Sequence, residues 1–351
     1  MKLVSVDYHS INCLSGIATF NRNLAHFFCH NIDFITVYQK ERVHDFKEDC
    51  LNIPYKFPFK LLNYTSNYRL YPFLISRKVK NYENSVIIFN SPSLLKYYRK
   101  GNNKVVLVQH QDFSIMFSNK SGFANSLDYL EYVFDKIDYF VCLSEQDRKK
   151  FKKNIPYKYH FKLRVIPHTT QMETGVSKKS LNRKLLMLGR LDNQQKRFDL
   201  AINAMNKLPD WKLSIFGDGK DRVYIETMIE KSQFKNISLH NYTSDVQSVL
   251  DCHDVHIMTS DFEGYPITNI EAVTRGMPLI VRDTFSSASD IIDDNGVLLE
   301  RDWSENSFIS AIKQVELNFE SYSKNSIEIS ERFSVEQVSR LWSDLIQECY
   351  Q

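Results

Sequence analysis

Short apolar runs alternate with amphipathic stretches along most of this chain. Runs such as Val105–Val108, Leu185–Leu188 and Leu279–Val281 contain no polar residue. Such runs are typical of strands that are buried on both faces of a parallel sheet. Between them, stretches such as residues 16–24 and 221–231 repeat apolar side chains at helical spacing. This alternation predicts an α/β protein.

The segment after the predicted strand Val255–Met258 is the most informative part of the chain. Its turn leads into a helix, because Pro266 suits the first helical turn, where its missing N–H is no loss. Gly276 suits the position just past the end of the same helix. Glu263 is therefore expected before the helix, and Glu271 is expected within it.

The predicted start of this helix offers a seat for an anion. Unpaired N–H groups and a partial positive charge gather at a helix N-terminus, where they favour phosphate. The two carboxylates would repel a phosphate, so we interpret them as acceptors for hydroxyl groups, one of a ribose and one of a sugar. Alternatively, they are a capping acid and a solvated helical acid. The residues of the predicted seat are Gly264, Tyr265, Pro266, Ile267 and Thr268.

A diphosphate leaving group would need positive charge, either from a metal held on carboxylates or from fixed Arg and Lys side chains. The chain contains no Asp-x-Asp motif, so protein cations are expected and no metal site is predicted. Arg190 and Lys196 both follow the strand Leu185–Leu188, at the end where open α/β sheets bind ligands. A single cation can also be a solvated surface charge, which is the interpretation we prefer for Arg197 and Lys207.

Two glycines, Gly217 and Gly219, follow another predicted strand that begins near Trp211. A dinucleotide-binding fingerprint would need a third glycine at position 222, where the chain has Arg222. The glycines are better explained by a tight turn or by close approach of the backbone to a ligand.

The ordered set of these motifs resembles the carboxyl-terminal half of the retaining glycosyltransferases of family 4, over residues 183–300. The motifs, in order, are Gly189-Arg190 with Lys196, then Phe216-Gly217-Asp218-Gly219, then Glu263-Gly264-Tyr265-Pro266 with Glu271. The resemblance implies the GT-B fold, with two Rossmann-like domains facing a central cleft. It also implies that Arg190 and Lys196 hold the donor diphosphate. Glu271 would bind the ribose hydroxyls and Glu263 a hydroxyl of the donor sugar, with retention of anomeric configuration and no divalent metal.

The amino-terminal half matches the same family less closely. Family members often carry a Gly-Gly pair after the first strand, and only Gly16 matches it here, as a donor-binding residue. His110 follows the strand Val105–Val108 and resembles the active-site histidine of the family, near the donor sugar and the reaction centre. A single histidine is alternatively structural or merely exposed.

Two domains are expected, because 351 residues exceed the usual size of a single core. We predict an amino-terminal, acceptor-side domain over residues 1–163. A nucleotide-sugar donor domain is predicted over residues 164–334, beginning with a strand at 164–168. Residues 335–351 are predicted to form a helix, which in GT-B enzymes often packs back on the first domain.

The charge pattern is more informative than the net charge of +3, which predicts no nucleic-acid partner. Lys and Arg interleave with Tyr and Phe between residues 55 and 104. This mixture suits an anionic membrane surface or a lipid-linked acceptor, and it equally suits a solvated face over an aromatic core. Six cysteines without metal-type spacing, and no evident leader, predict a cytoplasmic protein, peripheral at most to the inner face of the membrane.

The expected function is transfer of a hexose-type sugar from a UDP-linked donor to a hydroxyl of a glycan or lipid-linked acceptor, in bacterial surface polysaccharide synthesis. No cofactor is expected, because the nucleoside-diphosphate sugar is a co-substrate. Two alternatives stay open. One is a GT-B epimerase or hydrolase of sugar nucleotides, which needs no acceptor. The other is a non-catalytic subunit that binds a nucleotide sugar beside a partner enzyme.

Overall fold

The structure is a computed structural model that describes residues 2–13, 15–29, 31–38, 50–52, 61, 64, 69–119 and 122–351. The chain divides into two compact units. The first comprises Met1–Thr169 together with Val335–Gln351, and the second comprises Thr170–Ser334.

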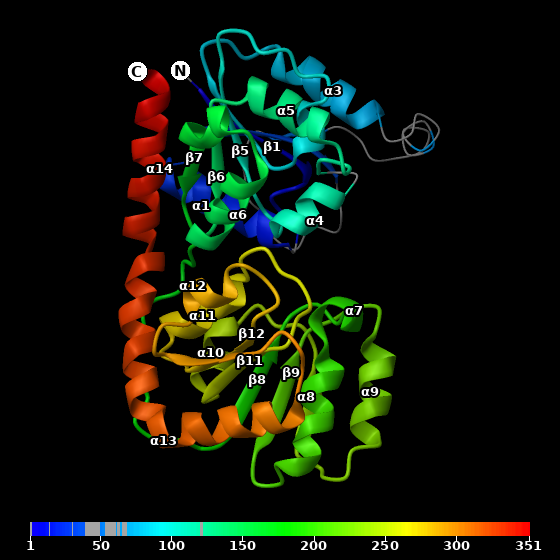
Figure 1. The fold of residues 1–351 in the computed structure, drawn as a ribbon, viewed down its shortest axis with the longest axis vertical. Helices are drawn as coiled ribbons and strands as arrows, with labels where there is room; N and C mark the ends of the chain where they lie inside the picture. Colours follow the sequence, from blue (N-terminus) through cyan, green and yellow to red (C-terminus); the bar gives the residue numbers. More distant parts are fainter. Residues whose placement is uncertain are drawn as a thin grey trace. The chain divides into compact units, whose positions relative to one another are not determined.

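The first unit is built on a parallel sheet, which within the described residues has seven strands in the order β3-β2-β1-β4-β5-β6-β7 (Figure 1). The strands are β1 (Leu3–His9), β2 (Ile32–Tyr38), β3 (Cys50–Asn52), β4 (Val86–Phe89), β5 (Lys104–Val108), β6 (Tyr139–Cys142) and β7 (Leu163–Val165). The helices are α1 (Gly16–Phe27), α3 (Leu70–Val79), α4 (Phe113–Ser118), α5 (Leu127–Lys136), α6 (Glu145–Asn154) and α14 (Val335–Tyr350). Strand order reverses between β1 and β4, so their carboxyl ends form the switch point where such sheets bind ligands.

The second unit is built on a parallel sheet of six strands in the order β10-β9-β8-β11-β12-β13 (Figure 1). The strands are β8 (Lys184–Leu188), β9 (Lys212–Phe216), β10 (Ile237–His240), β11 (Val255–Met258), β12 (Leu279–Arg282) and β13 (Gly296–Leu299). The helices are α7 (Asn193–Lys196), α8 (Phe198–Ala204), α9 (Arg222–Glu230), α10 (Val246–Asp251), α11 (Ile267–Thr274), α12 (Ala288–Ile291) and α13 (Glu305–Ser330). Strand order reverses between β8 and β11, which places the switch point of this sheet between them.

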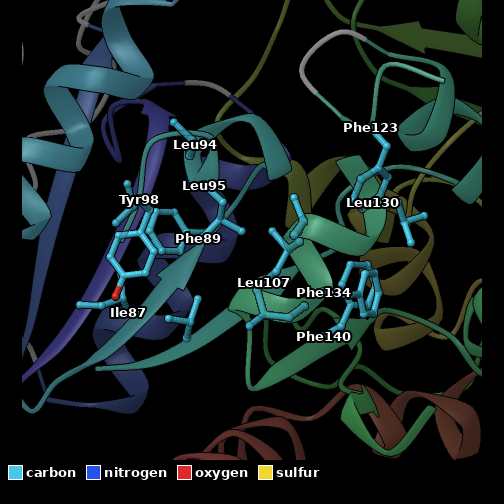
Figure 2. Packing of buried hydrophobic residues seen from close by; sticks show 14 of the residues in the cluster. Ile87, Phe89, Leu94, Leu95, Tyr98, Leu107, Phe123, Leu130, Phe134 and Phe140 are labelled. Carbon is cyan, nitrogen blue, oxygen red and sulfur yellow. The ribbon is translucent and has the colours of Figure 1, made fainter. Parts of the chain in front are cut away.

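Both sheets are buried because their strands are apolar on both faces. All four residues of β4 are buried, as are all four of β11 and β12. In the first unit, aromatic side chains fill the space between the sheet and its helices (Figure 2). Phe89 packs on Tyr98 with ring centroids 5.2 Å apart, and Phe134 stacks on Phe140 at 5.3 Å. This packing removes large apolar surfaces from water.

Local capping sets where several helices begin. The side chains of Ser15, Ser126 and Ser144 accept hydrogen bonds from N–H groups in the first turns of α1, α5 and α6. Each bond satisfies a backbone donor that the helix leaves unpaired. The serine before Gly16 therefore fixes the start of the helix that follows the first strand.

The carboxyl-terminal helix α14 belongs to the first unit, although it follows the second in the chain. Its amphipathic pattern buries Trp342, whose ring lies 5.6 Å from that of Phe20 in α1. Strand β7, which the sequence analysis assigned to the start of the second domain, pairs with β6 in the first sheet.

Part of the basic and aromatic region at residues 55–104 lies outside the described residues, namely 55–60, 62–63 and 65–68. In its described part, Tyr71 and Tyr98 are buried in the core, whereas Arg77, Lys78 and Lys80 are exposed. Exposed basic side chains above buried tyrosines fit both interpretations of this region, so the membrane contact and the solvated face stay predictions. Among the described residues, no helix has both the length and the apolar character needed to cross a bilayer.

Candidate functional site

The carboxyl ends of β8 and β11 meet at the switch point of the second sheet. Strand β8 continues into Gly189 and Arg190, and β11 continues toward Glu263. A Cβ atom at Gly217 would lie 1.9 Å from the carbonyl oxygen of Gly189. Only glycine therefore allows the chain that leaves β9 to pass so close to the end of β8.

Lys196 and Glu263 form an ion pair at this switch point. The distance from Lys196 Nζ to Glu263 Oε1 is 2.7 Å, and the two side chains are only 15% and 10% exposed. Gln195 Nε2 donates to the other carboxylate oxygen at 3.4 Å and to the carbonyl of Phe262 at 3.2 Å. Removing two charges from water costs free energy, and a buried ion pair often adds little to the stability of the fold. Because this pair also lies at the ligand-binding end of the sheet, it is a candidate functional site.

Backbone contacts tie helix α7, which ends at Lys196, to the segment after β11 that carries Glu263. The Thr259 hydroxyl donates to the carbonyl oxygens of Lys196 at 3.0 Å and of Arg197 at 2.9 Å. The N–H of Asp261 donates to the carbonyl of Gln195 at 2.8 Å. The fold, rather than the flexible Lys196 side chain alone, therefore sets where the ammonium group meets Glu263.

Arg197 is a structural residue, and its interpretation as a solvated surface charge was wrong. Its guanidinium contacts Asp199 at 3.0 Å and Asp261 at 3.1 Å, and Asp261 also accepts from Arg282 at 2.5 Å. The hydrogen bond to Asp199 raises the pKa of Arg197 above its usual range. The backbone of Arg197 is left-handed, with φ 52°, a strain that these paired charges hold in place. Lys207, by contrast, has a half-exposed side chain.

Glu271 lies on α11 with a half-buried carboxylate that has no hydrogen-bond partner among the described residues. Burial raises the pKa of Glu271 to about 7. The Thr268 hydroxyl, in the first turn of the same helix, is also buried without a partner in the described part of the chain. Unsatisfied polar groups are costly, and a polar ligand would satisfy them.

The turn that precedes α11 is held in place by contacts with the core of the second unit. Tyr265 is 6% exposed, and its ring lies 5.8 Å from that of Phe333. The carbonyl of Gly264 accepts a hydrogen bond from Ser287 at 2.8 Å. Pro266 precedes the first helical residue, and no side chain caps this helix start. Tyr265 therefore anchors the turn in the core, while the N-terminus of α11 keeps its anion-binding character.

Arg190 contributes the most accessible charge near the pair. Its side chain is 66% exposed, lies 4.0 Å from Asp192, and donates to Gln195 Oε1 at 2.9 Å. Within the described residues, no group of three or more His, Cys, Asp or Glu side chains is arranged to hold a metal ion.

His110 lies in the first unit, at the carboxyl end of β5. Its Nε2 atom lies 2.8 Å from Asn90 Oδ1, and its ring stacks on His168 with centroids 5.7 Å apart. Burial, followed by the neighbouring His168, lowers the pKa of His110 well below its ordinary value. His110 is therefore neutral at physiological pH.

The family that the sequence motifs suggested is supported by direct comparison. Residues 172–331, which include β8, β11 and the Lys196–Glu263 pair, match the family described as Glycosyl transferases group 1. Residues 172–331 belong to this family.

Two curated relatives have names that refer to O-antigen biosynthesis and to poly(ribitol-phosphate). The chain is 27% identical over 248 residues to the O-antigen biosynthesis glycosyltransferase WbnH of Escherichia coli, which covers 69% of this chain and 69% of that protein. It is 25% identical over 301 residues to the poly(ribitol-phosphate) alpha-N-acetylglucosaminyltransferase of Staphylococcus aureus, which covers 80% of this chain and 59% of that protein.

Solved structures share the fold of this glycosyltransferase along nearly its whole length. Sucrose-phosphate synthase from Thermosynechococcus elongatus superposes with a TM-score of 0.79 at 14% identity, over 99% of both chains. TarM from S. aureus, in a complex that contains UDP, superposes with a TM-score of 0.76 at 16% identity, over 98% of this chain and 99% of that chain. The predicted GT-B fold with two Rossmann-like domains is thereby confirmed.

The predicted site residues of this group 1 enzyme fall into two sets. Arg190, Lys196, Gly217, Glu263 and Glu271 gather at the switch point of the second sheet, together with the turn at residues 264–268. Gly16 and His110 lie in the first unit. Gly16 is the first residue of α1, and no described atom lies within 4 Å of the place where a Cβ would stand. The assigned roles of all these residues stay predictions.

Several residues around the Lys196–Glu263 pair were not predicted from the sequence. Gln195 precedes Lys196 in α7, but only the position of α7 in the folded unit brings its amide to Glu263. Asp261 precedes Glu263 by two positions, and its role depends on Arg282, which comes from the neighbouring strand β12. Asn90 directly follows the apolar run of β4, and a polar residue after such a run was a usable signal for a ligand-facing position.

Proposed function

We propose that this protein is a retaining, metal-independent glycosyltransferase that moves a sugar from a UDP-linked donor to a hydroxyl of a glycan or lipid-linked acceptor. The observation that carries the proposal is the Lys196–Glu263 pair at the switch point of the second sheet, beside the unpartnered carboxylate of Glu271. Family membership supports the same reaction class.

Positive charge around the pair suits a diphosphate leaving group. Lys196 and Arg190 would stabilise the negative charge that develops as the bond to the sugar breaks, with the N-terminus of α11 as a third source of positive potential. When the donor binds, the ammonium group of Lys196 would contact a phosphate oxygen as well as Glu263. This shared contact would leave carboxylate oxygens of Glu263 available to a hydroxyl of the donor sugar.

Glu271 would accept hydrogen bonds from the ribose hydroxyls, which fits a carboxylate without a partner in the described part of the chain. Retention of anomeric configuration would follow if the leaving phosphate oxygen takes the proton of the acceptor hydroxyl on the same face. In that mechanism no second carboxylate acts as nucleophile, and we assign none.

The relatives narrow the expected substrates. The names of the E. coli and S. aureus relatives refer to O-antigen biosynthesis and to poly(ribitol-phosphate), and several similar structures were solved with UDP. We therefore propose UDP as the nucleotide and a bacterial cell-surface polymer or its lipid-linked precursor as the acceptor.

A panel of nucleoside-diphosphate sugars tests this proposal. We expect one UDP-sugar to raise the thermal midpoint and, with acceptor present, to release UDP at a rate that EDTA does not change. Release without any acceptor would favour a hydrolase or epimerase. Donor binding without turnover across a broad set of acceptors would favour a non-catalytic subunit, and abolition of turnover by EDTA would contradict the metal-independent mechanism.

A further inference from the structure

The formal charge of the chain is divided unevenly between the two units. The first unit contains 26 Lys and Arg against 17 Asp and Glu, a net charge of +9, whereas the second contains 19 against 25, a net charge of −6. Two stretches supply most of the positive excess. Residues 148–164 contain eight Lys and Arg and no acid, and residues 69–104 contain eight with Glu83 as the one acid.

The two basic stretches meet at the edge of the first sheet where its strands begin. In a parallel sheet each crossover helix runs back along the strands, so the carboxyl ends of the helices lie at this edge. Helix α6 has Lys152 and Lys153 in its last turn, and α3 has Arg77 and Lys78. A 3₁₀ helix, η2 (Tyr157–Lys162), leads directly into β7. This edge is opposite the switch point, which lies at the carboxyl ends of the same strands.

Side-chain contacts join these elements into one surface. Lys162 Nζ donates to two backbone carbonyls at the end of α5, both at 2.6 Å, and so fixes η2 on that helix. Lys136 of α5 donates to the carbonyl of Tyr98 at 2.6 Å, and Ser76 of α3 donates to the carbonyl of the residue before it at 2.7 Å. We call this surface the basic edge. Its exposed members include Arg77, Lys78, Lys80, Arg99, Lys152, Lys153, Tyr157, Lys158 and Phe161.

Helix η2 exposes two aromatic side chains, although a buried tyrosine fixes its position. Tyr159 is 3% exposed and donates to Asp135 at 2.6 Å. On either side of it, Tyr157 is 86% exposed and Phe161 is 70% exposed. Because Tyr159 and Lys162 hold η2 on α5, the two rings are presented by an ordered element. Exposed apolar groups of this kind mark a surface that contacts a partner.

The cations around these rings are available to an external anion. The acids Glu131 and Asp138 are already paired, at 3.3 Å with Lys158 and at 2.7 Å with Lys100. The exposed cations of the edge that form no ion pair with a described residue are Arg77, Lys78, Lys80, Arg99, Lys152 and Lys153. A complementary partner therefore carries negative charge and also offers an apolar layer to the rings. An anionic bilayer offers both, because its headgroups are charged and its interface accommodates aromatic rings.

We propose that the basic edge docks the protein on a membrane that contains anionic phospholipids. Lys152 and Lys153 would meet the headgroups, while Tyr157 and Phe161 would enter the interfacial layer. The inference goes beyond the proposed glycosyl transfer and does not depend on it, since docking needs no donor. It also assigns the contact to residues 148–164, which lie outside the basic and aromatic region singled out in the sequence.

Vesicle binding by the full chain tests the proposal. The probes are vesicles of phosphatidylcholine alone and of an equal mixture with phosphatidylglycerol, and flotation measures the bound protein. We expect binding to the mixture alone, weakened by added salt, which screens exposed charges. Lys152→Ala combined with Lys153→Ala should weaken this binding about 30-fold. Lys231→Ala combined with Lys235→Ala, at exposed lysines of the second unit, is the matched control and should leave binding unchanged.

Phe161→Trp reports whether η2 enters the bilayer. The emission of the new indole is expected to shift to the blue with the mixed vesicles, because the ring leaves water for the interface. Val223→Trp, at a 73% exposed position of α9 in the second unit, is the control and should show no shift. The three native tryptophans contribute the same background to both variants.

Three results would overturn the proposal: no binding to the mixture, equal binding to both kinds of vesicle, or a lysine variant that binds like its control. Lysine-dependent binding without a blue shift in Phe161→Trp would indicate contact through charge alone, as with a soluble polyanion, and would also overturn it. Binding with all the expected features beside a silent panel of nucleotide sugars would support the docking surface and count against the transferase alone.

Discussion

Lys196 and Glu263 show how a single residue can serve both fold and chemistry. Their 2.7 Å contact is largely withdrawn from water, so removal of either partner leaves the other charge buried and unpaired. For Lys196, however, most of the predicted loss lies in the reaction, because the ammonium group would offset the charge of the departing diphosphate.

Replacing Lys196 by alanine tests this role. We expect Lys196→Ala to lower kcat by about 100- to 1,000-fold, as loss of one donor to a developing anion does in other enzymes. Steady-state kinetics with the donor found in the panel would measure it. Lys207→Ala is the matched control, because the Lys207 side chain is half-exposed. Wild-type turnover in Lys196→Ala would remove this residue from the mechanism.

Gly217 is required by packing. A methyl group there would lie 1.9 Å from a carbonyl oxygen of the neighbouring strand end, and backbone cannot move aside as a flexible side chain does. We expect Gly217→Ala to destabilise the second unit by about 3 kcal/mol or more, measured by thermal unfolding. Gly101→Ala, where a Cβ would meet nothing within 4 Å, should leave the midpoint within about a degree. An equally small effect of both variants would show that the strand ends can separate.

At the scale of elements, α11 combines an uncapped N-terminus with a carboxylate in its second turn. Glu271→Ala removes the group proposed to bind the ribose, and we expect donor affinity to fall about 10- to 100-fold with little change in folding. Titration calorimetry with UDP and with the UDP-sugar would measure the loss. Glu320→Ala, on an exposed face of α13, is the control. Unchanged affinity for UDP in Glu271→Ala would argue against a ribose contact.

Helix α14 completes the core of a unit from which it is distant in sequence. Trp342 is 1% exposed and packs against Phe20. We expect Trp342→Ala to destabilise the first unit by about 3–5 kcal/mol, because the large cavity left behind cannot close. Hydrogen exchange of peptides from α1 and β1 would report it. Tyr350→Ala, at a residue that is 57% exposed, should change this exchange little. Equal protection in both variants would mean that α14 is dispensable for the first unit.

At the scale of the whole molecule, each Rossmann-like unit holds, among its described residues, one carboxyl group whose pKa burial raises to about 7, Asp7 in the first and Glu271 in the second. In the unfolded chain such a carboxyl titrates near 4, so between pH 4 and 7 the folded state binds more protons. The stability that each group contributes is therefore fully present below pH 4 and is lost as the pH rises through 7.

Asp7→Asn makes this dependence measurable. The amide is always neutral and can still accept the N–H of Tyr8, so the variant should match the wild type near pH 4 and be more stable above pH 7. The difference should reach about 4 kcal/mol, from a pKa that moves from 3.8 to about 7. Hydrogen exchange of β1 and β4 between pH 5 and 8 would follow it. A difference that stays constant with pH would show that Asp7 does not titrate in this range.

The sequence by itself determined the elements and the set of charged residues at one sheet end. The helix between Pro266 and Gly276 and the terminal helix at 335–350 followed from local signals, because proline, glycine and apolar spacing act within a few residues. Arg190, Lys196, Glu263 and Glu271 could be chosen together because parallel strands bring their carboxyl ends to one side of a sheet. The family resemblance pointed to the same residues.

Only the tertiary structure decided which of these charges meet and which polar groups stay unpaired. The contact of Lys196 with Glu263, the bridge of Asp261 between Arg197 and Arg282, and the return of α14 to the first unit all join residues far apart in the chain. Asp7 lies within β1, and nothing local in the sequence marks it; its raised pKa comes from burial in the folded first unit. Burial and partner choice depend on strand order and loop conformation, which distant contacts set and local patterns do not encode.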